Sequence, residues 1–136
     1  MRRLAPWLLA IGFSAPGSAE SAGSAEIDAA LSCEAAPAPG RVRCDLTVRA
    51  RAGTLLDWAD ALVVAAPSFA RPLRSRVAPR ERRSGVPSVD LPFALVAAGT
   101  GRGELRVRAR AVVCRAALCR PASRDVRTEL AVGQTP

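Results

Sequence analysis

The sequence predicts an all-β protein, an antiparallel β-sandwich held together by two disulfides. Apolar and polar residues alternate with a period of two in several segments between residues 27 and 132, as they do in strands that bury one face. Stretches rich in proline and glycine separate these segments. No segment of the sequence has a convincing long helical period. The four cysteines of this 136-residue chain are enough for two bridges.

The amino terminus has the organisation of a secretory signal peptide. Arg2 and Arg3 precede a short apolar run, residues 4–13, and small residues follow it. The run is about half as long as the ~20 residues that a membrane-spanning helix needs. We therefore expect cleavage after Ala19, with Ala25 as the alternative, and a mature protein that is periplasmic or secreted and does not span a membrane.

The first two predicted strands each carry a cysteine. Residues 27–33 and 42–50 alternate apolar with polar or small side chains, and a loop rich in proline and alanine connects them. Cys33 and Cys44 both fall on the apolar face, where a hairpin brings facing Cβ atoms to about 4.5–5.5 Å. We therefore expect a buried Cys33–Cys44 bridge. Zinc ligation is disfavoured, because this interval is too long for a C-x2–4-C knuckle.

The middle of the chain is less regular. Residues 55–62 fit a short amphipathic helix, but we favour a turn around Asp57 and a strand that ends at Pro67, with Trp58 in the core. In the segment rich in arginine and proline that follows, we expect one irregular edge strand over residues 73–77 and then a solvated basic loop.

Alternation returns in the carboxy-terminal half, which predicts strands over residues 86–95, 105–113 and 126–132. The glycines of residues 99–104 lack the lysine of a phosphate-binding loop and fit a hairpin turn. Seven strands in about 100 residues fit an immunoglobulin-like sandwich. The predicted organisation is a signal peptide (1–19), a linker (20–26), the sandwich (27–133) and a tail (134–136).

The composition disfavours several kinds of chemistry. The chain has no His, Lys, Tyr or Asn. Without His it has no Ser–His or Cys–His nucleophile pair and no imidazole metal ligand, and without Lys it has no Schiff base. Asp57 and Asp60 are three residues apart, which we interpret as a solvated turn or cap and not as an acid–base pair. We expect no cofactor and no metal site, and a hydrolase is disfavoured.

Every basic residue is an arginine. The formal net charge is +8, and removal of the two leader arginines lowers it by two to +6. Such a charge attracts polyanions. However, the abundance of Ala, Arg, Gly, Pro and Val is typical of GC-rich coding, and few aromatic residues are present to stack on bases, so nucleic acid is not favoured. Arg106, Arg108 and Arg110, with the basic loop at residues 71–83, are candidates for binding an anionic surface.

The remaining cysteines lie between the last two predicted strands. Cys114 and Cys119 are separated by four residues at the top of a terminal hairpin, close enough to bridge each other. Arg115 and Arg120 flank them, and positive charge at an accessible tip favours the thiolate form of a cysteine. The pair is therefore either a structural bridge or a redox pair, and we favour the structural bridge.

A strand that runs into C-x4-C-x-P and is followed by a closing strand resembles the immunoglobulin-like N-terminal domain of the bacterial thiol:disulfide interchange reductases. The similarity covers mainly residues 105–132. In that family a cysteine pair near the end of the sandwich accepts electrons from a membrane domain and passes them to periplasmic thioredoxin-like partners. The resemblance implies that Cys114 and Cys119 are a redox pair and that the partner is thioredoxin-like. The family typically has five residues between these cysteines, whereas this chain has four.

Three hypotheses follow. The first is an exported, non-enzymatic sandwich module that binds or scaffolds an unknown protein partner in the periplasm. The second is a thiol:disulfide exchange domain that uses Cys114 and Cys119. The third is a binder of anionic surfaces that uses the arginines of residues 106–110. We favour the first, although a sandwich fold hosts many functions and decides none of them.

Overall fold

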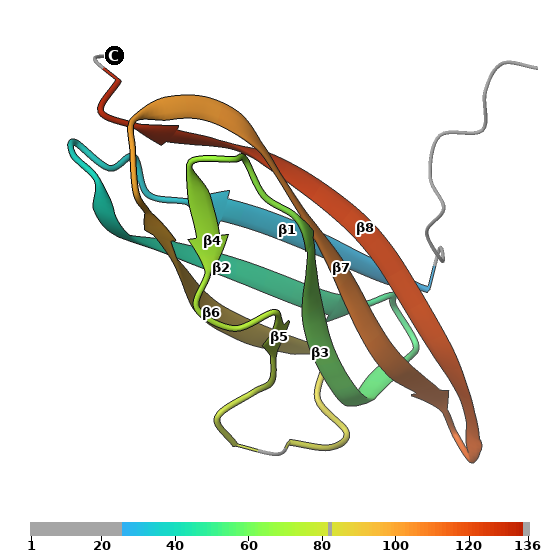
Figure 1. The fold of residues 1–136 in the computed structure, drawn as a ribbon. Helices are drawn as coiled ribbons and strands as arrows, with labels where there is room; N and C mark the ends of the chain where they lie inside the picture. The colour runs from blue at the N-terminus through green and yellow to red at the C-terminus, as the bar shows by residue number, and fades with distance from the viewer. Residues whose placement is uncertain (1–25, 82, 135–136) are drawn as a thin grey trace, which may run out of the picture.

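The computed structural model describes residues 26–81 and 83–134 (Figure 1). The predicted signal peptide and all of the predicted linker except Glu26 lie outside the described residues. Within the described part the chain forms eight strands, and no helix there is long and apolar enough to cross a membrane. The strands are β1 (Ile27–Cys33), β2 (Gly40–Ala50), β3 (Leu55–Ala65), β4 (Ala70–Pro72), β5 (Arg76–Val77), β6 (Ser88–Ala97), β7 (Gly101–Arg115) and β8 (Leu118–Val132).

The strands form two four-stranded sheets, which confirms the predicted antiparallel sandwich (Figure 1). The first sheet has the order β1-β2-β6-β4 and the second the order β5-β3-β7-β8, and all neighbouring strands are antiparallel. Apart from β5, these orders match the ABED and CFG sheets of an immunoglobulin-like sandwich. The extra strand β5 raises the count from the predicted seven to eight.

The segment that predicts one edge strand over residues 73–77 contains two short strands instead. β4 pairs with the end of β6 in the first sheet. The chain then crosses to the second sheet, where β5 pairs with β3. Val77 is buried there and anchors the crossover in the core. The crossover thus links the two sheets along one side of the sandwich.

The core lies between the sheets and follows the predicted alternation. In β2, for example, apolar side chains are buried and the arginines between them are exposed. On the side away from the crossover, Ala36 forms an isolated parallel β-bridge with Val132 of β8. Its N–H donates to the Ala131 carbonyl at 3.2 Å, which ties the β1–β2 connection to the end of the last strand.

β3 corrects the interpretation of the middle segment. It begins at Leu55, so the residues around Asp57 belong to a strand and form neither a free turn nor a helix. The register with β7 shifts between Leu56 and Trp58, which leaves Asp57 unpaired in a β-bulge. After the bulge, Trp58 and Asp60 lie opposite Val112 and Arg110 and share the outer face of the sheet with them. Trp58 is only half-buried there, so its predicted place in the core is wrong.

Candidate functional site

All four cysteines are paired, in the two pairings that the sequence predicts. Cys33 faces Cys44 across β1 and β2, and Cys114 faces Cys119 across β7 and β8. Each bridge therefore lies within one sheet and joins neighbouring strands. The first bridge meets the core, because Cys44 is 1% exposed. The second lies at the surface.

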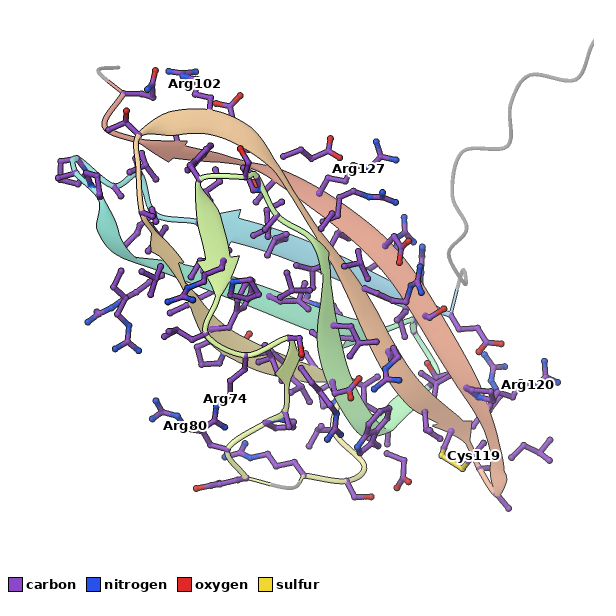
Figure 2. All side chains as sticks on the ribbon, viewed as in Figure 1. Arg74, Arg80, Arg102, Cys119, Arg120 and Arg127 are labelled. Carbon is purple, nitrogen blue, oxygen red and sulfur yellow. A yellow bond between two sulfur atoms is a disulfide. The ribbon has the colours of Figure 1, made fainter. Side chains whose placement is uncertain are left out.

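The Cys114–Cys119 bridge closes the tip of the β7–β8 hairpin (Figure 2). Residues 115–121, which we call the tip, are all exposed, and Leu118 is 73% exposed, the highest value among the large apolar side chains of the described part. Arg115 pairs with Leu118 across a two-residue loop. The first loop residue, Ala116, has a φ of 53°, a left-handed conformation that costs a residue with a Cβ about 1–2 kcal/mol. The disulfide thus holds a strained and exposed loop in one shape.

The surroundings of the two tip cysteines differ. Cys114 is half-buried at the end of β7, whereas Cys119 is exposed. The guanidinium of Arg115 lies over Gly53 in the β2–β3 turn, where an added Cβ would meet its Nη2 at 3.3 Å. Arg120 is 73% exposed, and its Nη1 lies 3.9 Å from a carboxylate oxygen of Glu26. An incoming group therefore reaches Cys119 in a positively charged setting.

Asp60 is completely buried, so the interpretation of Asp57 and Asp60 as a solvated pair is wrong for Asp60. Its Oδ1 accepts a hydrogen bond from Arg110 Nε at 2.8 Å, and its Oδ2 accepts one from Arg110 Nη2 and one from Arg76 Nε at 2.7 Å. Asp57 is exposed, and its Oδ1 accepts a hydrogen bond from the Ser84 hydroxyl. The two carboxylates therefore have different partners, Asp57 at the surface and Asp60 in a buried ion cluster.

The environment of Asp60 keeps it ionised. Burial raises the pKa of its carboxyl, but hydrogen bonds and charges from Arg110 and Arg76 outweigh that cost and bring the pKa below the ordinary value of 3.8. Trp58 adds a cation–π contact, because the Arg110 Cζ lies 5.6 Å from the centre of its ring. Both carboxylate oxygens of Asp60 accept hydrogen bonds from these arginines, as a buried structural ion cluster requires.

The three candidate anion-binding arginines of β7 share one face but differ in their partners. Arg108 holds Asp125 of β8 through two hydrogen bonds, at 2.7 and 3.1 Å, and Arg110 holds Asp60. Arg106 is half-buried, and its Nε has no hydrogen-bond partner among the described residues. Two of the three charges are therefore compensated within the fold. The role of these arginines in binding an anionic surface stays a prediction.

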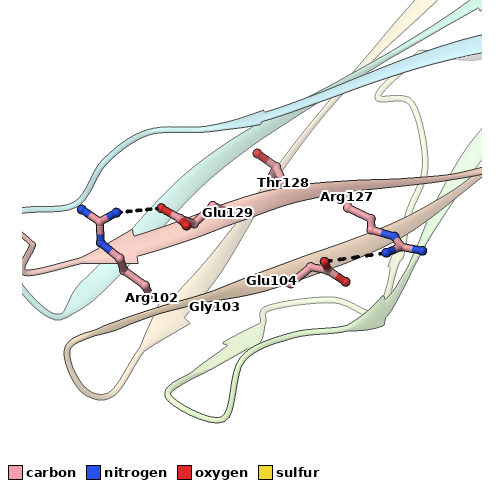
Figure 3. A pocket seen from close by; sticks show the side chains of 6 residues that line it. All are labelled: Arg102, Gly103, Glu104, Arg127, Thr128 and Glu129. Carbon is pink, nitrogen blue, oxygen red and sulfur yellow. Dashed lines mark hydrogen bonds and ion pairs between the residues drawn. The ribbon is translucent and has the colours of Figure 1, made fainter.

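A shallow pocket of ≈ 410 Å³ lies at the end of the β7–β8 ribbon that is distant from the disulfide (Figure 3). Arg102 pairs with Glu129 at 3.1 Å, and Arg127 lies 3.9 Å from Glu104. The two positive and two negative charges cancel. The pocket therefore has no excess charge with which to attract an ion.

The part of the chain that the structure describes contains no cluster of three or more Cys, Asp or Glu residues that could hold a metal ion. No protein-family model matches the chain, and a comparison with curated proteins finds no relative. The function is therefore inferred from the geometry and chemistry of the chain's own residues.

Proposed function

We propose that this protein is an exported, non-enzymatic β-sandwich module that binds a protein partner through its tip, residues 115–121. The exposure of the whole tip around Leu118 carries this proposal. Leu118 offers apolar surface that a partner can bury, and the flanking Arg115 and Arg120 are of a residue type that is enriched at protein interfaces. The Cys114–Cys119 bridge fixes the loop before binding, so less conformational entropy is lost when a partner docks.

The disulfides support the exported location. Bridges of this kind form and persist in oxidising compartments such as the periplasm, and small exported domains use them to supplement a modest core. In the chain-entropy picture, the sequence separations of 11 and 5 residues correspond to about 3 and about 2 kcal/mol of stabilisation. Together with the predicted signal peptide, they are the basis for placing the module outside the cytoplasm.

Site-specific photo-crosslinking tests this proposal. A photo-crosslinking amino acid replaces Leu118, and in a matched variant it replaces Val64, which is 40% exposed on β3. In cells that export the protein, we expect a discrete adduct of defined mass from position 118 and none from position 64. Equal labelling from both positions, or no adduct from position 118, would show that the tip is not the contact surface.

The exposure of Cys119 favours thiol:disulfide exchange at the same tip as a second candidate. In such an exchange a thiolate of a dithiol partner attacks the Cys119 Sγ, a mixed disulfide forms, and Cys114 leaves as a thiolate that takes up a proton. The second thiolate of the partner then attacks the mixed disulfide and releases Cys119. Two electrons pass to the sandwich, and the dithiol partner becomes oxidised. The same steps in reverse pass two electrons from the reduced Cys114 and Cys119 to an oxidised thioredoxin-like partner, which is the direction that the resemblance implies.

A redox titration separates the two candidates, and Cys33–Cys44 serves as an internal control. The mature protein is equilibrated in graded redox buffers, alkylated and mapped by mass spectrometry. The binding module predicts that both bridges resist reduction until the protein unfolds. Exchange predicts that Cys114–Cys119 opens well before Cys33–Cys44, and a potential below about −300 mV for the tip bridge would exclude it.

A further inference from the structure

Four arginines beside the first sheet lie around one pocket of ≈ 990 Å³. Arg41 and Arg43 project from β2 on the face opposite the core, and both are exposed. The β4–β5 crossover supplies Arg74, and the segment after β5 supplies Arg80; the two lie near each other at this edge of the molecule (Figure 2). We call these four residues the pocket arginines.

The pocket exists because β4 leaves the first sheet after three residues. The N–H of Leu73 makes one more bond, to the Ala94 carbonyl at 3.0 Å, and the chain then crosses to the second sheet. Beyond that point β6 has β2 on one side and no described strand on the other. Pro92 lies in this part of β6, where its missing N–H leaves no unpaired donor. The edge of β6 that β4 leaves uncovered lines the pocket through Pro92 and Ala94.

The pocket arginines are not neutralised by the fold. None of them makes an ion pair with a carboxylate among the described residues. Asp45 is the one acidic residue that lines the pocket in the described part of the chain, and the fifth lining arginine, Arg76, pairs with Asp60. Glu34 lies nearby but accepts the backbone N–H of Arg43 and not its guanidinium. The pocket therefore has an excess of positive charge, unlike the pocket between Arg102 and Arg127.

We propose that this pocket binds a compact polyanion that carries at least two phosphate groups, on a soluble molecule or on a lipid headgroup. The planar guanidinium fork matches the geometry of phosphate, and one phosphate carries only about −1.5 to −2 charges, so four arginines call for more than one. The volume is that of a small-molecule site. Leu73, which is 54% exposed, supplies an apolar wall for a carbon skeleton. This site goes beyond the proposed binding at the tip and uses none of its residues.

The test measures binding of inorganic pyrophosphate to the mature protein by isothermal titration calorimetry at low salt. The variant Arg74→Gln/Arg80→Gln removes two pocket arginines that are exposed and unpaired, so it is expected to fold. The matched control Arg102→Gln/Arg127→Gln removes the same charge from the other pocket. We expect the first variant to lose at least about tenfold in affinity and the control to stay within about twofold. The variant Arg41→Gln/Arg43→Gln tests the same site from β2.

A second arm of the test distinguishes the source of the phosphates. It measures co-sedimentation with phosphatidylcholine vesicles that contain cardiolipin, whose headgroup carries two phosphates. Vesicle binding without pyrophosphate binding, lost in Arg74→Gln/Arg80→Gln only, supports a lipid headgroup as the source, and pyrophosphate binding supports a soluble one. Failure of wild-type protein to bind either probe overturns the proposal. Equal losses in the pocket and control variants also overturn it, because they would reflect overall charge and not a site.

Discussion

At the scale of single residues, Asp60 shows how the fold handles a buried charge. A carboxylate without water loses several kcal/mol of hydration, which the protein recovers only through close and complete hydrogen bonding. Arg110 supplies two hydrogen bonds and Arg76 a third. Because both guanidinium groups are more than a third exposed, they remain partly hydrated while they neutralise Asp60. The carboxylate is therefore the member of the cluster that depends most on its partners.

Replacing Arg110 by methionine should therefore be strongly destabilising. The variant keeps Asp60 buried with one hydrogen bond from Arg76, and we expect the free energy of unfolding to fall by about 3 kcal/mol, as measured by urea denaturation. Arg102→Met is the matched control, because Arg102 and its partner Glu129 are both exposed, and we expect a loss below about 1 kcal/mol. Similar losses in the two variants would show that Asp60 does not depend on Arg110.

At the scale of elements, the sequence predicts the regular strands and misses the irregular ones. β7 buries every second residue from Leu105 to Val113, so the period of two identifies this part of the strand. In β3 the bulge at Asp57 moves the following residues to the opposite face and breaks the alternation, so the sequence favours a turn around Asp57 where the strand has already begun. β4 and β5 have three and two residues, which is too short for any period to appear.

The same distinction applies to the candidate sites. The pairing of Cys33 with Cys44 is predictable because hairpin register depends on local sequence. The burial of Asp60 is not, because it requires Arg110, 50 residues further along the chain. The pocket arginines likewise meet only because β4 and β5 belong to different sheets. Their signals in the sequence are the pair Arg41 and Arg43 on the polar face of β2 and the basic loop at residues 71–83, which contains Arg74 and Arg80. That these two segments meet at one pocket could not be predicted from either.

At the scale of the whole molecule, the two sheets differ in how many of their arginines have carboxylate partners. On the second sheet, most of the outward arginines of β7 and β8 have carboxylate partners, such as Asp60, Asp125 and Glu129. Beside the first sheet, the pocket arginines have no carboxylate partner within residues 26–81 and 83–134. A net charge that is spread evenly by coding bias would not predict this separation. The pocket arginines lie outside the tip, residues 115–121, so the two proposed binding surfaces share no residue.

The ion pairs of Asp60 and Asp125 on the second sheet should make the stability of the whole molecule sensitive to acid. The pKa of Asp60 is lowered because Arg110 and Arg76 outweigh the effect of burial, and the pKa of Asp125 is lowered chiefly by its hydrogen bonds from Arg108. A carboxyl whose folded pKa lies below its unfolded value binds protons more readily in the unfolded state. Its stabilisation is therefore complete above the unfolded value, near 3.8, and is lost as the pH falls through the folded pKa.

We expect the midpoint of thermal unfolding, followed by circular dichroism, to drop between about pH 5 and pH 2. Asp125→Asn should make this drop shallower, whereas Asp57→Asn, at an exposed carboxyl, should leave it unchanged. If Asp125→Asn and wild-type protein lose stability in parallel over this range, the ion pair with Arg108 does not contribute to folding.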